Sequence, residues 1–167
     1  PKAHLDVARW IEDAPVGEQI REFQTALFGE FDKVDPFALS RLTRLYVAIG
    51  FAVEARTLLE DLDADFDGRE ILLELTGIVA DAPYPAEGLL HAQIDCPAHV
   101  TLWRTIAIDR GETLPVDGID AVVAAFSELP IETRRQVGPR LVRSLLNRNQ
   151  TDAARTAFAV VDRAPGD

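Results

Sequence analysis

Cysteine, methionine and long apolar runs are scarce in this chain, and their scarcity excludes several classes of protein. The sequence holds one cysteine, Cys96, so no disulfide can form within the chain. The longest apolar run extends from Leu45 to Val53 and contains Gly50, whereas a membrane-spanning helix needs ~20 apolar residues. We therefore expect no membrane insertion, and a soluble protein of the cytoplasm or periplasm. Because the chain begins at Pro1 without an initiator methionine, we also expect a processed form or a piece of a longer protein.

Positive charge is also scarce. The chain has 17 lysines and arginines against 28 aspartates and glutamates, which gives a formal net charge of −11. A phosphate backbone repels such a surface, so general nucleic-acid binding is disfavoured. With 167 residues, 47% of them apolar, the chain is long enough to bury a substantial core as one domain, residues 1–167.

Recognisable catalytic motifs are missing as well. The sequence contains no G-x-S-x-G nucleophile motif, no H-E-x-x-H zinc motif, no glycine-rich phosphate loop and no dinucleotide-binding fingerprint. Cys96 and His99 carry the atoms of a thiolate pair, but nothing marks an oxyanion site beside them. We therefore expect a protein that is not an enzyme and that uses no cofactor.

The chain does contain a pattern of paired helices. Apolar residues recur at helical spacing over 36–49, Gly50 interrupts them, and the spacing resumes up to Leu62. The same pattern returns 99 residues later: Arg41, Leu42, Arg44, Ala55, Arg56 and Thr57 correspond to Arg140, Leu141, Arg143, Ala154, Arg155 and Thr156. This repetition predicts two similar helical hairpins, each with a small alanine at the helix crossing.

The first of these hairpins resembles the tetratricopeptide repeat. The residues that carry the resemblance are Leu42, Tyr46, Gly50 and Ala55, although Thr43 stands where that family usually has glycine. The resemblance covers about two thirds of the chain and is clearest over 38–62 and 137–165. It implies an all-α fold, in which α/α hairpins stack into a right-handed solenoid with a concave groove.

Steps of 33 residues extend the pattern along the chain. They lead from Ala55 to Gly88, Ala121 and Ala154, and from the first helix to Leu72, Leu75 and Val79. We further expect helices over 4–12, 16–28 and 99–109, and a last pair over 131–147 and 150–163. The prediction is therefore a solenoid of about five antiparallel helical hairpins.

Two acidic or mixed clusters could hold a metal ion. Asp63, Asp65, Asp67 and Glu74, with Gly68 at the bend, follow the spacing of an EF-hand calcium loop. The alternative is an acidic loop whose Asp67 caps the following helix. Zinc ligands are also available in His91, Asp95, Cys96 and His99, where the alternative is a helix start capped by Asp95. We place no metal at either cluster.

Arginines are the main functional clue. Arg134, Arg135, Arg140, Arg143 and Arg148 lie close together in an otherwise acidic chain. The tetratricopeptide resemblance implies that Arg44 and Arg143 share a position that usually faces the concave groove. We therefore predict a non-catalytic scaffold that binds a peptide or partner helix, with Arg44, Arg140 and Arg143 pairing with its carboxylates. The alternatives are arginines paired within the molecule, a structural segment or cap of a longer solenoid, and a calcium-binding module at 63–74.

Overall fold

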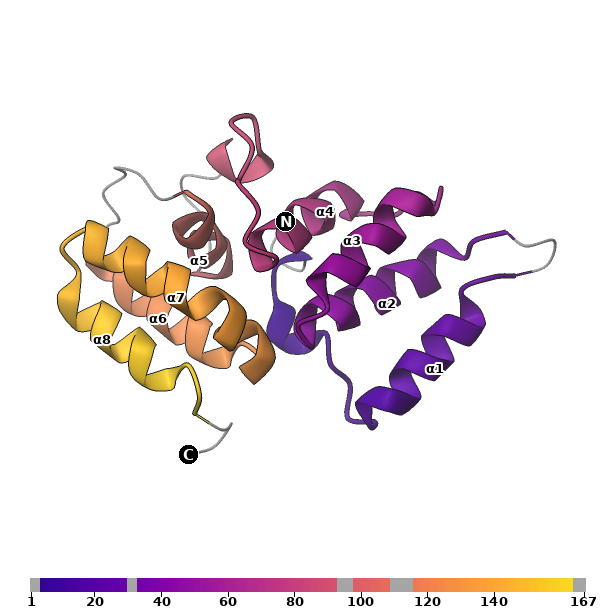
Figure 1. Ribbon diagram of the computed structural model, residues 1–167, viewed down its shortest axis with the longest axis horizontal. Coiled ribbons are helices and arrows are strands. Elements are labelled where there is room, and N and C mark those ends of the chain that lie inside the picture. The colour runs from indigo at the N-terminus through magenta and orange to yellow at the C-terminus, as the bar shows by residue number, and fades with distance from the viewer. Residues whose placement is uncertain (1–3, 30–32, 93–97, 109–115, 164–167) are drawn as a thin grey trace.

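The computed structural model describes residues 4–29, 33–92, 98–108 and 116–163. Figure 1 shows helices throughout these ranges, and the only β-pairing within them is an isolated bridge between Phe28 and Val34. None of the described helices is both long and apolar enough to cross a bilayer. The α-helices in this part of the chain are α1 (Val16–Ala26), α2 (Pro36–Ala48), α3 (Ala52–Asp61), α4 (Arg69–Val79), α5 (Ala98–Ala107), α6 (Val116–Glu128), α7 (Ile131–Asn147) and α8 (Thr151–Val160).

The all-α prediction is confirmed for the described residues, and at each of the two positions related by 99 residues a tight turn joins two helices, α2 to α3 and α7 to α8. Gly50 ends α2 with φ +89, and Asn149 ends α7 with φ +59. In each turn the next amide bonds five residues back, from Phe51 N to Tyr46 O at 2.7 Å and from Gln150 N to Leu145 O at 2.9 Å. This is the bond that closes a helix C-terminus through a left-handed residue. The two turns are therefore the same structure built on different residues.

The N-terminal segment differs from its prediction. A helix is expected over 4–12, but none of these residues is α-helical, and the segment contains 3₁₀ turns such as η2 (Val7–Arg9). Leu5 and Val7 are both buried, 2% and 0% exposed, and a spacing of two suits extended chain rather than one helix face. The carbonyl of Leu5 accepts a hydrogen bond from Trp103 Nε1 at 3.0 Å, so it is engaged by α5 rather than by its own segment.

The 33-residue step also breaks in the middle of the chain. Instead of a helix around Gly88, the chain forms a turn and a 3₁₀ helix, η4 (Leu89–Ala92). Pro83 and Pro85 lack the amide hydrogens that a helix interior requires. Farther on, Ala121 is only partly exposed at the surface of α6, and Ala125, one turn later, is the buried alanine at 3% exposure. In two of the expected hairpins, one helix is thus reduced to a 3₁₀ turn.

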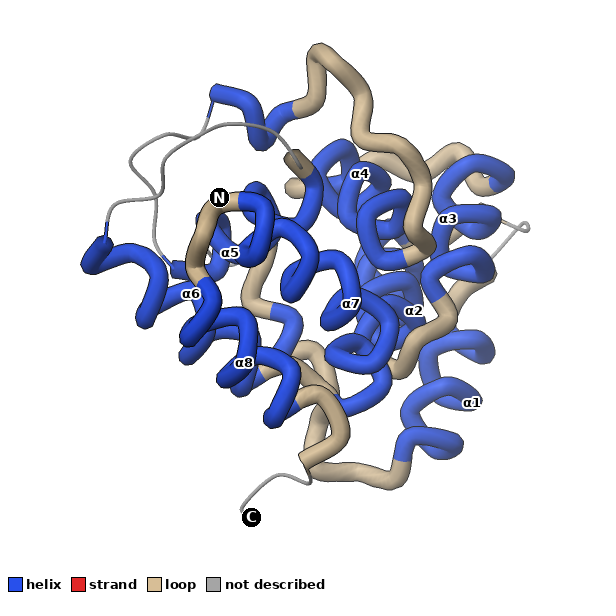
Figure 2. The backbone as a smooth tube through the Cα atoms, turned by 60° about the vertical axis from the view of Figure 1, so that its left-hand side comes forward, coloured by secondary structure: helices blue, strands red, loops and turns tan. Residues whose placement is uncertain are grey.

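Two groups of helices meet at a shared core. Figure 1 shows α1–α4 on one side and α5–α8 on the other, with the N-terminal segment between them. Figure 2 shows α7 in the middle of the molecule, where it packs against α2, α4, α5 and α8. A smaller apolar cluster joins α1 to α2 through Phe23, Leu27, Leu39, Leu42 and Leu45. The N-terminal segment and α7 therefore hold the two groups together.

Candidate functional site

A cleft of about 520 Å³ lies where the N-terminal segment meets the loop between α3 and α4. Its lining residues come from distant parts of the chain: His4, Leu5, 65–71, Leu89, Leu90 and Val100. Half of the lining residues are apolar, and the others include His4 and four charged residues. Among the apolar residues Leu89 is 42% exposed, whereas Leu90 and Val100 are almost completely buried. The apolar surface open to a ligand therefore comes from Leu89 and the partly buried Phe66 and Ile71, and such a surface is typical of small binding sites.

One end of the cleft is organised around His4. Its Nε2 lies 3.2 Å from Asp67 Oδ2, and its Nδ1 lies 3.4 Å from an Arg44 guanidinium nitrogen. Because arginine can only donate, Nδ1 acts as the acceptor, and the ring proton on Nε2 is donated to Asp67. Gly68 has φ +84, and a Cβ there would come within 2.4 Å of His4 Nδ1. Glycine is therefore required at this position both by conformation and by space.

One interpretation of the sequence predicted that Asp67 caps the following helix. The structure shows that it does not. The N-cap residue of α4 is Gly68, and no side-chain hydrogen bond closes this terminus. The side chain of Asp67 is 95% exposed and turns to His4. Asp67 thus belongs to the rim of the cleft, where its charge remains accessible.

The residues of the predicted calcium loop do not gather around one point. Glu74, the twelfth residue of that pattern, accepts hydrogen bonds from Tyr84 Oη at 2.6 Å and from Leu89 N at 2.8 Å. Burial and the bond to Glu74 raise the pKa of the Tyr84 hydroxyl. Tyr84 Oη in turn accepts a hydrogen bond from Leu90 N at 2.8 Å. Glu74 and Tyr84 therefore stabilise the conformation of the 80–92 loop. Across the described ranges, no three acidic, histidine or cysteine side chains are grouped to hold a metal.

The predicted zinc residues are only partly described. Asp95 and Cys96 lie outside the described residues. His91 Nε2 lies 3.2 Å from Pro85 O, and its ring packs 5.4 Å from that of Tyr84. His99 is in the first turn of α5. His91 is therefore engaged in holding the 80–92 loop.

The three arginines predicted to bind a partner occupy different surroundings. Arg44 on α2 is half-buried, with its guanidinium 5.9 Å from the Trp10 ring centroid. Burial lowers its pKa, while the charge of Asp67 acts in the opposite direction. Arg140 on α7 pairs with Asp81 at 3.1 Å and donates to Ile78 O at 2.6 Å. Arg143 is exposed, and none of its contacts in the described part of the molecule is a hydrogen bond or an ion pair.

Other members of the arginine group also bond within the molecule. Arg135 pairs with Glu132 at 3.1 Å and with Asp162 at 2.8 Å, and the hydrogen bond to Asp162 raises its pKa. Arg134 is only 3% exposed and donates to Val160 O and Arg163 O at 2.5 Å. For Arg134 and Arg135, these contacts agree with the alternative interpretation, in which the arginines are paired within the molecule.

A role of α7 that the sequence analysis missed is to satisfy the ends of other helices. Its side chains donate to carbonyls at the C-termini of α2, α4, α5 and α8: Thr133 to Ala48, Arg140 to Ile78, Ser144 to Thr105 and Arg134 to Val160. The last carbonyls of a helix have no partner within it. The only feature of the sequence that indicates this role is the presence of these four polar residues on α7.

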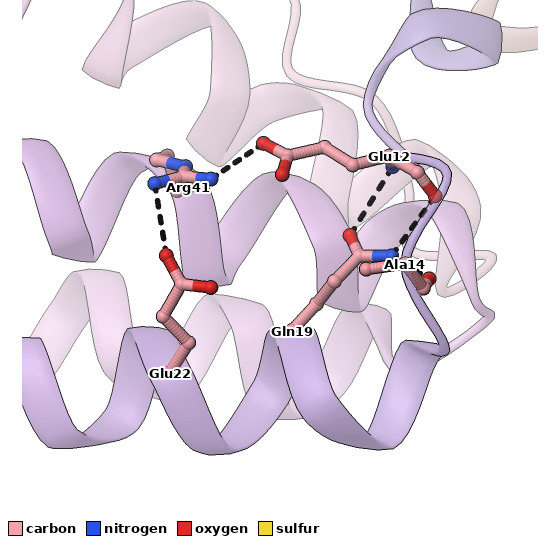
Figure 3. Close-up of polar contacts among 5 residues, drawn as sticks. All are labelled: Glu12, Ala14, Gln19, Glu22 and Arg41. Carbon is pink, nitrogen blue, oxygen red and sulfur yellow. Dashed lines mark hydrogen bonds and ion pairs between the residues drawn. The ribbon is translucent and has the colours of Figure 1, made fainter.

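A second missed contact positions the N-terminal segment that forms one wall of the cleft. Figure 3 shows Gln19 on α1 bonded to the backbone of residues 12 and 14, with Nε2 3.0 Å from Glu12 O and 2.5 Å from Ala14 O. Beside it, Arg41 on α2 lies 2.5 Å from Glu12 and 3.5 Å from Glu22. Gln19 is 1% exposed. These bonds fix the end of the segment opposite His4.

Comparison of the chain with protein-family models, with curated proteins and with solved structures gave no match.

Proposed function

We propose that this protein is a non-catalytic interaction scaffold, a helical-repeat protein of tetratricopeptide-like hairpins, that binds a short segment of another polypeptide. The cleft between His4 and Val100 is the binding site in this proposal. The observation that carries it is the apolar lining of a cavity of about 520 Å³, which includes the 42%-exposed side chain of Leu89. Surfaces of this kind are typical of recognition sites for one or two apolar side chains.

The proposed site is displaced from the one that the arginine pattern predicted. Arg44 approaches the cleft only from behind His4, to which it is hydrogen-bonded. Arg140 is engaged by Asp81 and by helix-terminal carbonyls. Arg143 keeps an exposed charge, and we retain it as a separate candidate contact with an acidic partner.

A second candidate function is a structural one, as a segment or cap of a longer helical solenoid. It is favoured by Phe158 on the last helix, α8, whose side chain is 73% exposed. In a stacked array the outer face of one hairpin is covered by the next. Amide hydrogen exchange in α8, measured on this chain and on any longer product of its gene, should slow in the longer form under this alternative. Equal exchange rates would remove it.

Binding at the cleft is tested by panning a phage-displayed library of random peptides on the purified protein. Peptides that are enriched are then measured by fluorescence polarisation on the wild type, on Leu89→Gln and on Leu146→Gln. The two variants are matched, because Leu89 is 42% and Leu146 49% exposed but only Leu89 lines the cleft. We expect Leu89→Gln to weaken binding about tenfold and Leu146→Gln to leave it unchanged. Absence of enriched peptides, or equal losses in both variants, would refute the proposal.

A further inference from the structure

The rim of the cleft carries more negative than positive charge. Three carboxylates line it, those of Asp65, Asp67 and Glu70, against one arginine, Arg69, and His4. Asp65 and Glu70 are exposed, and within the described part of the chain they form no hydrogen bond or ion pair. Both carboxylates are therefore available to a ligand.

The positive groups of the rim are already engaged. Arg69 donates from its guanidinium to Leu59 O, at the end of α3, so its charge is turned toward the helix C-terminus. His4 is bonded between Asp67 and Arg44. The lining thus carries three carboxylates against one guanidinium, and this excess of negative charge lies next to the apolar side chains of Phe66, Ile71 and Leu89.

We infer that the cleft recognises a peptide segment in which an apolar side chain is followed or preceded closely by lysine or arginine. The apolar side chain enters beside Leu89, and the cationic group pairs with Asp65 and Glu70. Charge complementarity selects this occupant, because an acidic segment would meet two unpaired carboxylates of like charge. The inference deepens the proposed function and rests on it.

The test uses a charge-reversed variant and a matched control in the same panning experiment. The variant is Asp65→Lys with Glu70→Lys. The control is Asp120→Lys with Glu128→Lys, two exposed acids of α6 outside the cleft, which change the net charge by the same amount. We expect the wild type and the control to enrich peptides with lysine or arginine beside an apolar residue. The reversed variant should enrich peptides with aspartate or glutamate in those places.

Affinity measurements then supply the magnitude. One enriched peptide and its Lys/Arg→Gln version are measured on the wild type at two salt concentrations. Exposed ion pairs contribute little individually, so the neutral version should bind about fivefold more weakly at low salt. The difference should shrink at high salt, because salt screens exposed pairs.

The outcomes separate the inference from the proposed function. Enriched peptides that depend on Leu89 but show the same composition on the wild type and on the reversed variant would overturn the inference alone. A loss of basic preference in the α6 control as well would also overturn it, since bulk charge would then explain the selection. Failure to enrich any peptide that depends on Leu89 would overturn both.

Discussion

The hairpins α2/α3 and α7/α8 share one sequence register but differ in what their charged side chains contact. Leu42 and Leu141 are equally buried, at 1% and 0% exposure. Ala55 and Ala154 are likewise buried at the helix crossings, at 0% and 2%. Even the hydroxyls of Thr57 and Thr156 bond to the carbonyl four residues earlier in both copies. Packing residues have therefore kept equivalent positions in the two hairpins.

The corresponding arginines of the two hairpins, in contrast, have different contacts. Arg41 packs 4.0 Å over the Phe23 ring and pairs with Glu12, while its counterpart Arg140 bonds to the ends of α4 and α5. Arg44 lies against His4 and Trp10, while its counterpart Arg143 is exposed. The long arginine side chain takes whatever acceptor its neighbourhood offers. A shared register thus predicts the core of a hairpin but not the partners of its charges.

The largest expected effect breaks the core of each hairpin in turn. Leu42→Ala and Leu141→Ala should each lower the free energy of unfolding by about 2–5 kcal/mol, because each removes a fully buried side chain. Urea denaturation monitored by circular dichroism measures this. Leu146→Ala, at an exposed position of α7, is the control and should change stability by about 0.5 kcal/mol or less. A loss below about 1 kcal/mol in only one hairpin would contradict their equivalence.

The helix crossings provide a sharper comparison. Ala55→Leu and Ala154→Leu should each cost about 1–3 kcal/mol of stability, because neither site has room for a larger side chain. Ala121→Leu is the matched control, since Ala121 follows the same 33-residue step but is only partly buried. We expect it to be nearly neutral in the same denaturation assay. Equal losses at all three positions would instead favour a 33-residue repeat that continues through α6.

The two turns differ in which residue adopts positive φ. Gly50→Ala should destabilise by about 1–2 kcal/mol, because a Cβ is strained in the left-handed region. That Cβ would also lie 3.0 Å from Gln136 Nε2. Asn149→Gly should change stability by only about 0.5 kcal/mol, because it adds conformational freedom without removing the turn. Thermal unfolding measures both, and a Gly50→Ala protein as stable as the wild type would show that the turn can be rebuilt.

The smallest effects concern the corresponding arginines. Arg44→Gln should cost about 1 kcal/mol, since it removes a half-buried cation near Trp10. Arg143→Glu should change stability by about 0.5 kcal/mol or less, because the side chain is exposed. If Arg143 contacts an acidic partner, the same variant should weaken capture of that partner while the melting temperature is kept. A large drop in melting temperature for Arg143→Glu would instead make it a stabilising residue.

The candidate site was much less predictable than the hairpins. The acidic stretch from Asp63 to Glu74 has the spacing of a calcium loop, but Glu74 bonds to Tyr84 and Leu89, while Asp65 and Asp67 line the cleft. No local pattern indicated that Leu5, Leu90 and Val100 would meet there. Leu5 is far from Leu90 and Val100 along the chain, and only packing brings them together.

Most of the helices and the two related hairpins could be predicted from the sequence alone, because helical spacing, a turn residue and a small crossing residue are local properties that neighbours along the chain can satisfy. The remaining features depend on tertiary packing. Residues 4–15 lie between the two helix groups, and two of the expected helices are 3₁₀ turns. The side chains of α7 bond to the ends of four other helices. These features depend on which buried polar groups need a hydrogen-bond partner and which spaces must be filled. Both are defined only after the helices have packed together.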